Sequence, residues 1–129
     1  MQNYQILSNT KRLVGKKVYL TTVGKNHMDR LTQLLTMMRD KPTDTFLIFA
    51  LALEYKSVGN ILESILYFER LVNEFPDYVA TYYQYGKLAE EMGDMTKAVD
   101  LFNKGIIKAK VAGDQKTARE LQQAIDMMD

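Results

Sequence analysis

The sequence predicts an all-α fold, a solenoid of helical hairpins, because a stretch of thirty-four residues occurs twice in succession. Residues 45–78 and 79–112 align without a gap. The alignment pairs residues of similar kind, as in Ala52 and Gly86, Gly59 and Gly93, Asn60 and Asp94, Ile65 and Val99, and Phe68 and Phe102. Repeats of this kind stack into an extended surface and do not enclose a catalytic pocket.

The first twenty-seven residues form a basic segment that precedes the repeats. Its charged residues are all basic, at Lys11, Arg12, Lys16, Lys17 and Lys25. Residues 17–23 are β-branched and aromatic, and therefore locally strand-like. Apolar residues from Ile6 to Val18 could instead form a weak helical stripe. The sequence leaves three interpretations open: the segment is disordered, it docks on the repeats, or translation truly starts at Met28.

A helix is predicted over residues 29–40, where apolar residues follow helical spacing. These apolar residues are Leu31, Leu34, Leu35 and Met38. Pro42 precedes Pro76 by one repeat length, so residues 29–44 are interpreted as half of a degenerate earlier repeat. Proline disfavours helix at the residue before it, and Thr43 or Asp44 can cap the next helix.

The first full repeat should contain two helices separated by a glycine. Its first helix is expected over about residues 44–58 and should end at Gly59, since glycine takes the left-handed conformation at low steric cost. Asn60 is a suitable N-cap for the second helix, and Glu63 supports it in the manner of a capping box. This second helix cannot continue through Pro76.

The second repeat and the end of the chain carry the same signals for the ends and starts of helices. Gly93 should end one helix and Asp94 should cap the next, which runs to Val111. The sequence Ala112-Gly113-Asp114 breaks the chain again, and a last helix is expected over residues 116–128. Its inner side is predicted to carry Ala118, Leu121, Gln122, Ile125 and Met128.

These elements divide the chain into two parts. Residues 1–27 are the basic N-terminal segment, and residues 28–129 are one repeat domain. Within this domain, residues 113–129 are interpreted as a capping helix, because a solenoid needs a polar helix to close its exposed end.

Composition excludes several classes of function. The chain has no cysteine, so it has neither a disulfide nor a thiolate zinc site, and this fits a cytoplasmic protein. No apolar run is long enough to cross a membrane. The only histidine, His27, has no cysteine nearby and no acidic residue four positions on, so we expect neither a metal nor a cofactor. Glu90 and Glu91 are adjacent on a helix, and their side chains diverge too far to act as a catalytic pair. We therefore expect no enzymatic activity.

The chain resembles the tetratricopeptide repeat family in the order of its bulky and small residues. On the first helix of each repeat, the family pattern of a bulky residue, a leucine and a small residue matches Ile48, Leu51 and Ala52, then Tyr82, Tyr85 and Gly86. On the second helix, the small and aromatic sites match Ser64 and Phe68, then Ala98 and Phe102. The departures are Leu71, Ala89 and Lys110. The resemblance implies a right-handed superhelix that binds proteins.

In this family the first helix of each repeat lines the inner groove. Carried over to this chain, the groove side chains are Phe46, Phe49, Leu53 and Lys56 from the first repeat, and Tyr83, Gln84, Lys87 and Glu90 from the second. Phe49, Leu53 and Tyr83 would receive an apolar peptide or helix, with Lys87 supplying a charge contact. Alternatively, residues 1–27 or the preceding helix already cover this patch. A well-known subgroup of this family binds the C-terminal carboxylate of heat-shock chaperones with lysines and asparagines in the groove. The matching sites of the first repeat here are Phe49 and Leu53, so the resemblance argues against binding of chaperone tails.

The leading hypothesis is an adaptor that binds a protein or peptide partner in this groove. A second hypothesis is a self-associating structural subunit, in which the groove or an end helix joins copies of the chain. Binding of nucleic acid through the basic residues 1–27 is a weaker hypothesis, because the net charge of the whole chain is only +1.

Overall fold

The computed structural model describes the backbone of residues 22–128 and the side chains of residues 29–128. Over this range the chain forms six helices: α1 (Thr22–Asp40), α2 (Thr45–Ser57), α3 (Ile61–Glu74), α4 (Ala80–Glu91), α5 (Met95–Val111) and α6 (Gln115–Asp126). None of these helices is both long and apolar enough to span a membrane. The basic residues 1–21, and the alternatives offered for them, lie outside the described residues.

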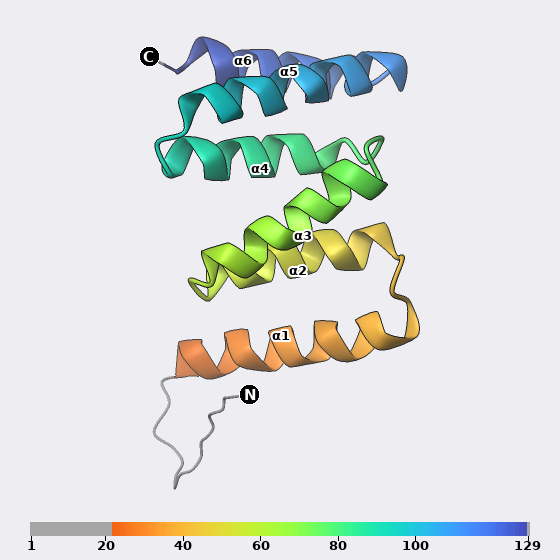
Figure 1. Cartoon of the computed structure of the whole chain (residues 1–129), viewed down its shortest axis with the longest axis vertical. Helices are drawn as coiled ribbons and strands as arrows, with labels where there is room; N and C mark the ends of the chain where they lie inside the picture. The colour runs from red at the N-terminus through yellow and green to blue at the C-terminus, as the bar shows by residue number, and fades with distance from the viewer. Residues whose placement is uncertain (1–21, 129) are drawn as a thin grey trace, which may run out of the picture.

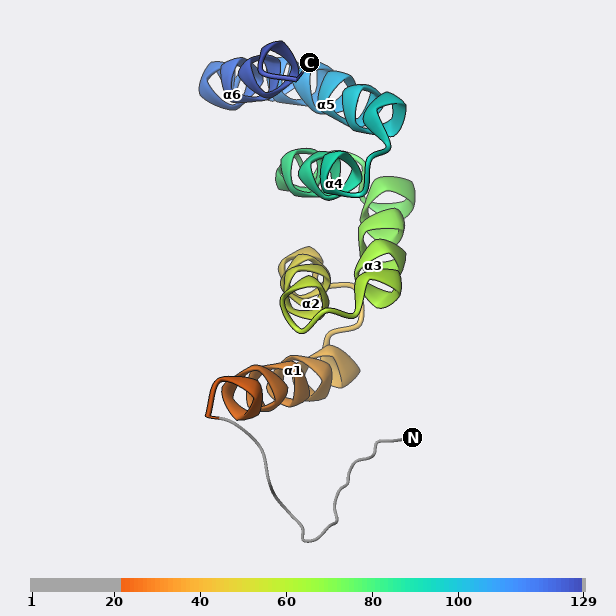
Figure 2. The same cartoon turned by 90° about the vertical axis from the view of Figure 1, so that its left-hand side faces the viewer.

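The helices follow one another along a single stack, each antiparallel to the one before it (Figure 1). Seen from the side, α2, α4 and α6 lie on one flank, and α3 and α5 lie on the other (Figure 2). Helices α2 and α4 are set back between α1 and α6, so the flank of α2, α4 and α6 is concave (Figure 2). The predicted all-α fold of sequential hairpins is confirmed.

Three glycine turns of one kind join α2 to α3, α4 to α5, and α5 to α6. In each turn a glycine takes a left-handed φ, which is 85° at Gly59, 84° at Gly93 and 77° at Gly113. The N–H after the glycine donates to the carbonyl five residues earlier, at 2.9, 2.9 and 2.8 Å respectively. This hydrogen bond is the signature of the Schellman motif, for which glycine is the preferred residue.

The predicted N-caps are present. Asp44 accepts a hydrogen bond from the N–H of Leu47 (3.2 Å), and Asn60 accepts one from the N–H of Glu63 (3.3 Å). Asp94, also predicted, caps α5 in the same way, and Asp114, for which no cap was predicted, caps α6. Each of these side chains satisfies a backbone N–H that the helix itself leaves without a partner.

Two helix details differ from the sequence-based expectation. Helix α1 begins at Thr22, earlier than the expected residue 29, so Thr22 and Val23 of the strand-like stretch are helical. Preference for strand depends strongly on tertiary context, and a helix stacked on α2 offers no partner strand. In α6, Gln122 is exposed, contrary to the predicted inner side, and Ala124 is buried instead.

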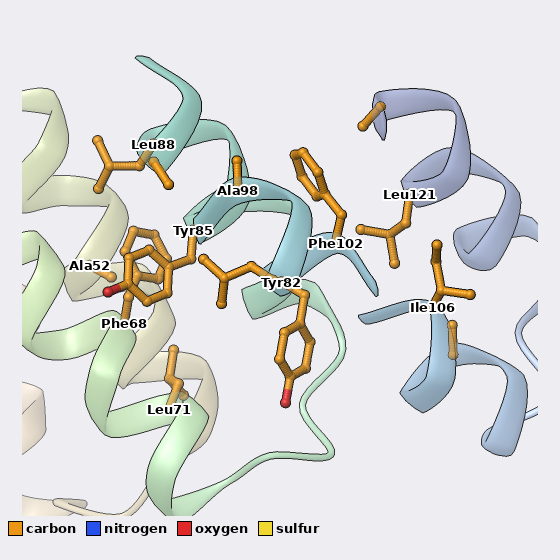
Figure 3. Close-up of a cluster of buried hydrophobic side chains, with 14 of the residues drawn as sticks. Ala52, Phe68, Leu71, Tyr82, Tyr85, Leu88, Ala98, Phe102, Ile106 and Leu121 are labelled. Carbon is orange, nitrogen blue, oxygen red and sulfur yellow. The ribbon is translucent and has the colours of Figure 1, made fainter. Parts of the chain in front are cut away.

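The core is a continuous row of side chains between the two flanks (Figure 3). All ten residues that carry the repeat pattern are buried, namely Ile48, Leu51, Ala52, Ser64, Phe68, Tyr82, Tyr85, Gly86, Ala98 and Phe102. The small sites permit close packing of the helices. A Cβ added to Gly105 would lie 2.6 Å from Cβ of Tyr82, so only glycine fits where α5 crosses α4.

A polar cluster links three helices at the edge of this core. The hydroxyl of Tyr85 on α4 donates to Glu69 on α3, and the Lys97 ammonium on α5 lies 3.3 Å from the same carboxylate. Burial and, after it, the hydrogen bond to Glu69 together raise the pKa of Tyr85 to about 12. Burial opposes ionisation of Glu69, but hydrogen bonds from Tyr85 and Lys97 outweigh it and lower the pKa of that carboxyl.

Candidate functional site

The eight predicted groove residues lie on α2 and α4, the two middle helices of the concave flank, in two separate groups (Figure 2). The first group is on α2, which faces α1 and α4. The second is on α4, part of which faces α6. The sequence prediction placed no groove residue on α6.

On α2 the predicted residues differ in exposure. Phe46, at the start of the helix, is 66% exposed. Phe49 and Leu53 are half-buried and pack against the core. The ring of Phe49 meets the ring of Tyr78 edge-on at 5.6 Å and that of Phe68 at 6.5 Å. Phe49 thus stabilises the fold as well as contributing to the surface.

An ion pair links α2 and α4 across the seam, that is, the surface where these two helices face each other. The Lys56 ammonium lies 3.3 Å from a carboxylate oxygen of Glu91, near the ends of the two helices. Gln84, also on α4, is half-buried. The seam therefore already contains paired or packed side chains, and an incoming peptide would find less free apolar surface here than the sequence suggested.

A hollow of about 540 Å³ opens between α4 and α6. Three predicted groove residues, Tyr83, Lys87 and Glu90, line its α4 side at helical spacing. The α6 side is lined by Glu120, Gln123, Ala124 and Met127. Tyr83 is 38% exposed and Met127 is 77% exposed, so both offer apolar surface to a ligand. The hollow brings together three predicted residues and four that sequence reasoning did not assign to a site.

Three of the missed residues lie on α6, which was interpreted as a cap, and Met127 directly follows the last residue of this helix. A signal for their role was present in the sequence. Gly113-Asp114 repeats the turn of Gly59-Asn60 and Gly93-Asp94, so α6 folds back from α5 as α5 folds back from α4. This turn returns α6 to the flank of α2 and α4, where it forms the second wall of the hollow.

Charged side chains in and beside the hollow form local ion pairs. The Lys87 ammonium lies 3.1 Å from Glu90, and this hydrogen bond raises the pKa of Lys87. On α6, Glu120 lies 3.3 Å from the well-exposed Lys116. The exposed pair of Lys116 and Glu120 contributes little stability, so a ligand can replace Lys116 at small cost. The lining carries one cation, Lys87, and two carboxylates.

The arrangement is suited to binding and offers no evident chemistry. Within residues 29–128, no cluster of three or more histidine, cysteine, aspartate or glutamate side chains could hold a metal ion. An exposed aromatic ring, a flexible thioether and carboxylates from two helices are the elements with which proteins bind apolar and charged side chains of a partner.

Comparisons with known proteins agree with this geometry. A family model described as a tetratricopeptide repeat matches residues 79–106. The solution structure of a tetratricopeptide repeat domain protein from Salinibacter ruber is 42% identical, with a TM-score of 0.63 over 65% of this chain and 85% of that one. A crystal structure of such a domain protein from the same organism is 41% identical, with a TM-score of 0.60 over 64% of this chain and 91% of that one. No curated protein matches the chain.

Domains built from tetratricopeptide repeats generally bind proteins and are usually non-catalytic. This chain is 42% identical to a solved repeat domain and covers 85% of the length of that domain. The repeat pattern of the sequence and the stacked hairpins of the structure lead to the same conclusion. The chain belongs to the tetratricopeptide repeat family.

Proposed function

We propose that this chain is a non-enzymatic adaptor that binds a peptide or short helix of a partner protein on its concave flank. The observation that supports this proposal is the hollow between α4 and α6. It has an exposed aromatic ring, Tyr83, on one wall and an exposed Met127 on the other. Apolar side chains of this size, left in water on a concave surface, commonly mark a binding site.

The charges around the hollow indicate the chemistry of the partner. Glu90 and Glu120 line it, and Glu91 lies beside Glu90 at the end of α4. Lys87 supplies the single positive charge of the lining. A segment that inserts an apolar side chain between Tyr83 and Met127 and places a lysine or arginine nearby would therefore be favoured. A guanidinium group could also stack on the exposed tyrosine ring.

Selection of peptides on the full chain tests this proposal. Displayed random peptides would be enriched on the protein, and the affinities of synthetic copies would be measured by fluorescence polarisation. We expect the enriched sequences to share an apolar residue close to a lysine or arginine. Enrichment of acidic peptides, or of no common pattern, would contradict the proposed partner chemistry.

Two matched substitutions locate the binding surface. Glu120→Lys reverses a charge in the hollow, and Asp100→Lys reverses one on α5, on the opposite flank. Both acids form an i,i+4 ion pair with an exposed lysine, at 3.3 and 3.2 Å, and both side chains are about half-exposed, at 51% and 58%. We expect Glu120→Lys to weaken peptide binding about tenfold or more, which is about 1.4 kcal/mol. Asp100→Lys should leave binding unchanged, and equal effects of the two would place the site elsewhere.

A second candidate function is self-association, and an exposed pair on α3 favours it. Leu62 is 78% exposed and Leu66 is also strongly exposed. The second repeat has Thr96 and Asp100 at the same places, so packing of the repeat does not require leucine there. Light scattering of the natural chain and of Leu62→Thr with Leu66→Asp tests this candidate. A dimer that the double variant converts to a monomer would support it, and a natural monomer at high concentration would rule it out.

A further inference from the structure

We propose that residues 1–21, which precede α1, dock along the concave flank of the same chain and occupy the hollow between α4 and α6. The segment would then compete with the partner, so the chain regulates its own binding site. This consequence for the partner rests on the proposed function, but the docking of the segment can be tested without any partner.

The place where the segment joins the domain favours this contact. Helix α1 runs antiparallel to α2, and its first residue lies at the edge of the stack where α2, α4 and α6 end (Figure 1). Three acidic residues, Glu90 and Glu91 on α4 and Asp126 on α6, lie at these helix ends, against one lysine, Lys56, at the end of α2. The last carbonyl groups of a helix add partial negative charge to such an edge. A basic segment therefore leaves α1 beside a negatively charged edge.

Charge complementarity supports the same contact. Residues 1–21 carry four basic residues, Lys11, Arg12, Lys16 and Lys17, and no acidic residue. Residues 29–128 contain fifteen acidic and twelve basic residues, so they carry a net charge of −3. The segment and the domain therefore attract each other at low ionic strength.

The opposite flank offers a poorer place for a basic segment. Helices α3 and α5 together carry five basic and four acidic residues, a net charge of +1, whereas α2, α4 and α6 carry four basic and five acidic residues, a net charge of −1. The positive charge is concentrated on α5, whose four lysines would repel the segment. The hollow instead combines carboxylates with apolar surface, and the segment combines basic residues with apolar ones such as Leu13 and Val14. Electrostatics thus favours the concave flank.

The length of the segment matches the distances along this flank. An extended chain spans up to about 3.5 Å per residue, and packed helices are separated by about 8–10 Å. Lys16 and Lys17 can therefore lie up to about 20 Å from Thr22, roughly two helix spacings, at the level of α4. Lys11 and Arg12 can reach about 35 Å, to the level of Glu120 on α6. The residues between these two basic pairs, Leu13 and Val14, would fall at the hollow.

Paramagnetic broadening in the full chain tests the proposal. The chain contains no cysteine, so Thr10→Cys creates a single site for a nitroxide label. We expect the label to broaden amide signals at the end of α4, from Leu88 to Met92, and in α6, from Glu120 to Met127. Signals of α3, around Leu66, should remain sharp. Broadening absent from α4 and α6, or equally strong on α3, would overturn the proposal.

Two controls establish what causes the broadening and whether it arises within one chain or between two copies. Exchanging Lys11, Arg12, Lys16 and Lys17 for glutamate in the labelled chain should abolish it, because the attraction becomes repulsion. A mixture of isotope-labelled chains without nitroxide and unlabelled chains with nitroxide reports contacts between copies. Broadening that persists undiminished in this mixture would assign the contact to a second copy, and would overturn docking within one chain.

Peptide affinity separates this inference from the proposed function. If the segment covers the hollow in nine chains of ten, the four-glutamate variant should bind a selected peptide about tenfold more tightly than the natural chain. If peptides bind both chains with equal affinity, the adaptor function stands and self-docking is refuted. If the nitroxide broadening is present but no peptide is enriched, the segment docks and the proposed adaptor function fails.

Discussion

Replacing Gly105 with alanine should destabilise the protein, although alanine is normally the better helix residue. Gly105 lies inside α5, where it packs against α4 and α6. An added Cβ would stand 2.6 Å from Cβ of Tyr82 and 2.9 Å from Cδ1 of Leu121. Leu121 could turn its methyl group, but Cβ of Tyr82 cannot move without the backbone of α4. Tyr82 is itself anchored, because its hydroxyl donates to the carbonyl of Pro76 at 2.6 Å.

The expected size of this effect follows from two opposing contributions. Overpacking of a core costs about 1–3 kcal/mol, and the contact with Tyr82 is short enough to place Gly105→Ala at the upper end. Exchange of glycine for alanine in a helix returns about 1 kcal/mol. The net loss should be about 2 kcal/mol, which lowers the melting temperature by about 8 °C in a domain of this size.

Thermal unfolding followed by circular dichroism measures this loss. The control is Asn103→Ala, an exposed position two residues earlier in the same helix, where we expect the melting temperature to stay the same or rise slightly. A Gly105→Ala variant at least as stable as the natural chain would refute the close approach of α4 and α5. It would then also refute the explanation of why small residues recur at these sites.

Three further predictions concern the polar contacts. Tyr85→Phe should cost about 1 kcal/mol in urea unfolding and remove one tyrosine that titrates at about pH 12; an unchanged titration curve would contradict the buried hydroxyl. The raised pKa of Tyr85 stabilises the fold below pH 10, and this stability should be lost as the pH rises towards 12. The lowered pKa of Glu69 stabilises the fold above its usual value of 4.5, so stability should fall with pH below that value, and less so in Glu69→Gln. Asp114→Ala should lower the stability of the helix start and speed hydrogen exchange in α6, since the carboxylate of Asp114 accepts from the N–H and hydroxyl of Thr117. Unchanged exchange would show that packing alone holds α6.

Much of the fold could be predicted because local signals and the repeat agree. Gly59 and Gly93 mark turns by their backbone freedom, and Asn60 and Asp94 mark helix starts by their short polar side chains. The start of α1 could not be predicted in this way. Its first residues are β-branched, and only packing against a neighbouring helix decides such a stretch.

The candidate site was only partly predictable. The pattern of one repeat identifies residues on the inner face of its own first helix, so Tyr83, Lys87 and Glu90 could be named. The opposing wall depends on where the next helix returns, which is a matter of tertiary arrangement. Met127, which is 77% exposed in the hollow lining, therefore stayed unassigned. The repeat pattern also did not show that Phe49 lies against Tyr78, because that contact joins α2 to the loop between α3 and α4 and depends on how the chain returns there.

Chemical-shift mapping of a selected peptide on the isotope-labelled full chain tests the central claim most directly. The account predicts that the largest amide shifts occur at Tyr83, Lys87 and Gln123, on the two walls of the hollow. Signals on the opposite flank, around Leu66 and Ile107, should scarcely move. Shifts concentrated around Leu66 or Ile107, with those of the hollow unchanged, would contradict the claim that the concave flank is the binding surface.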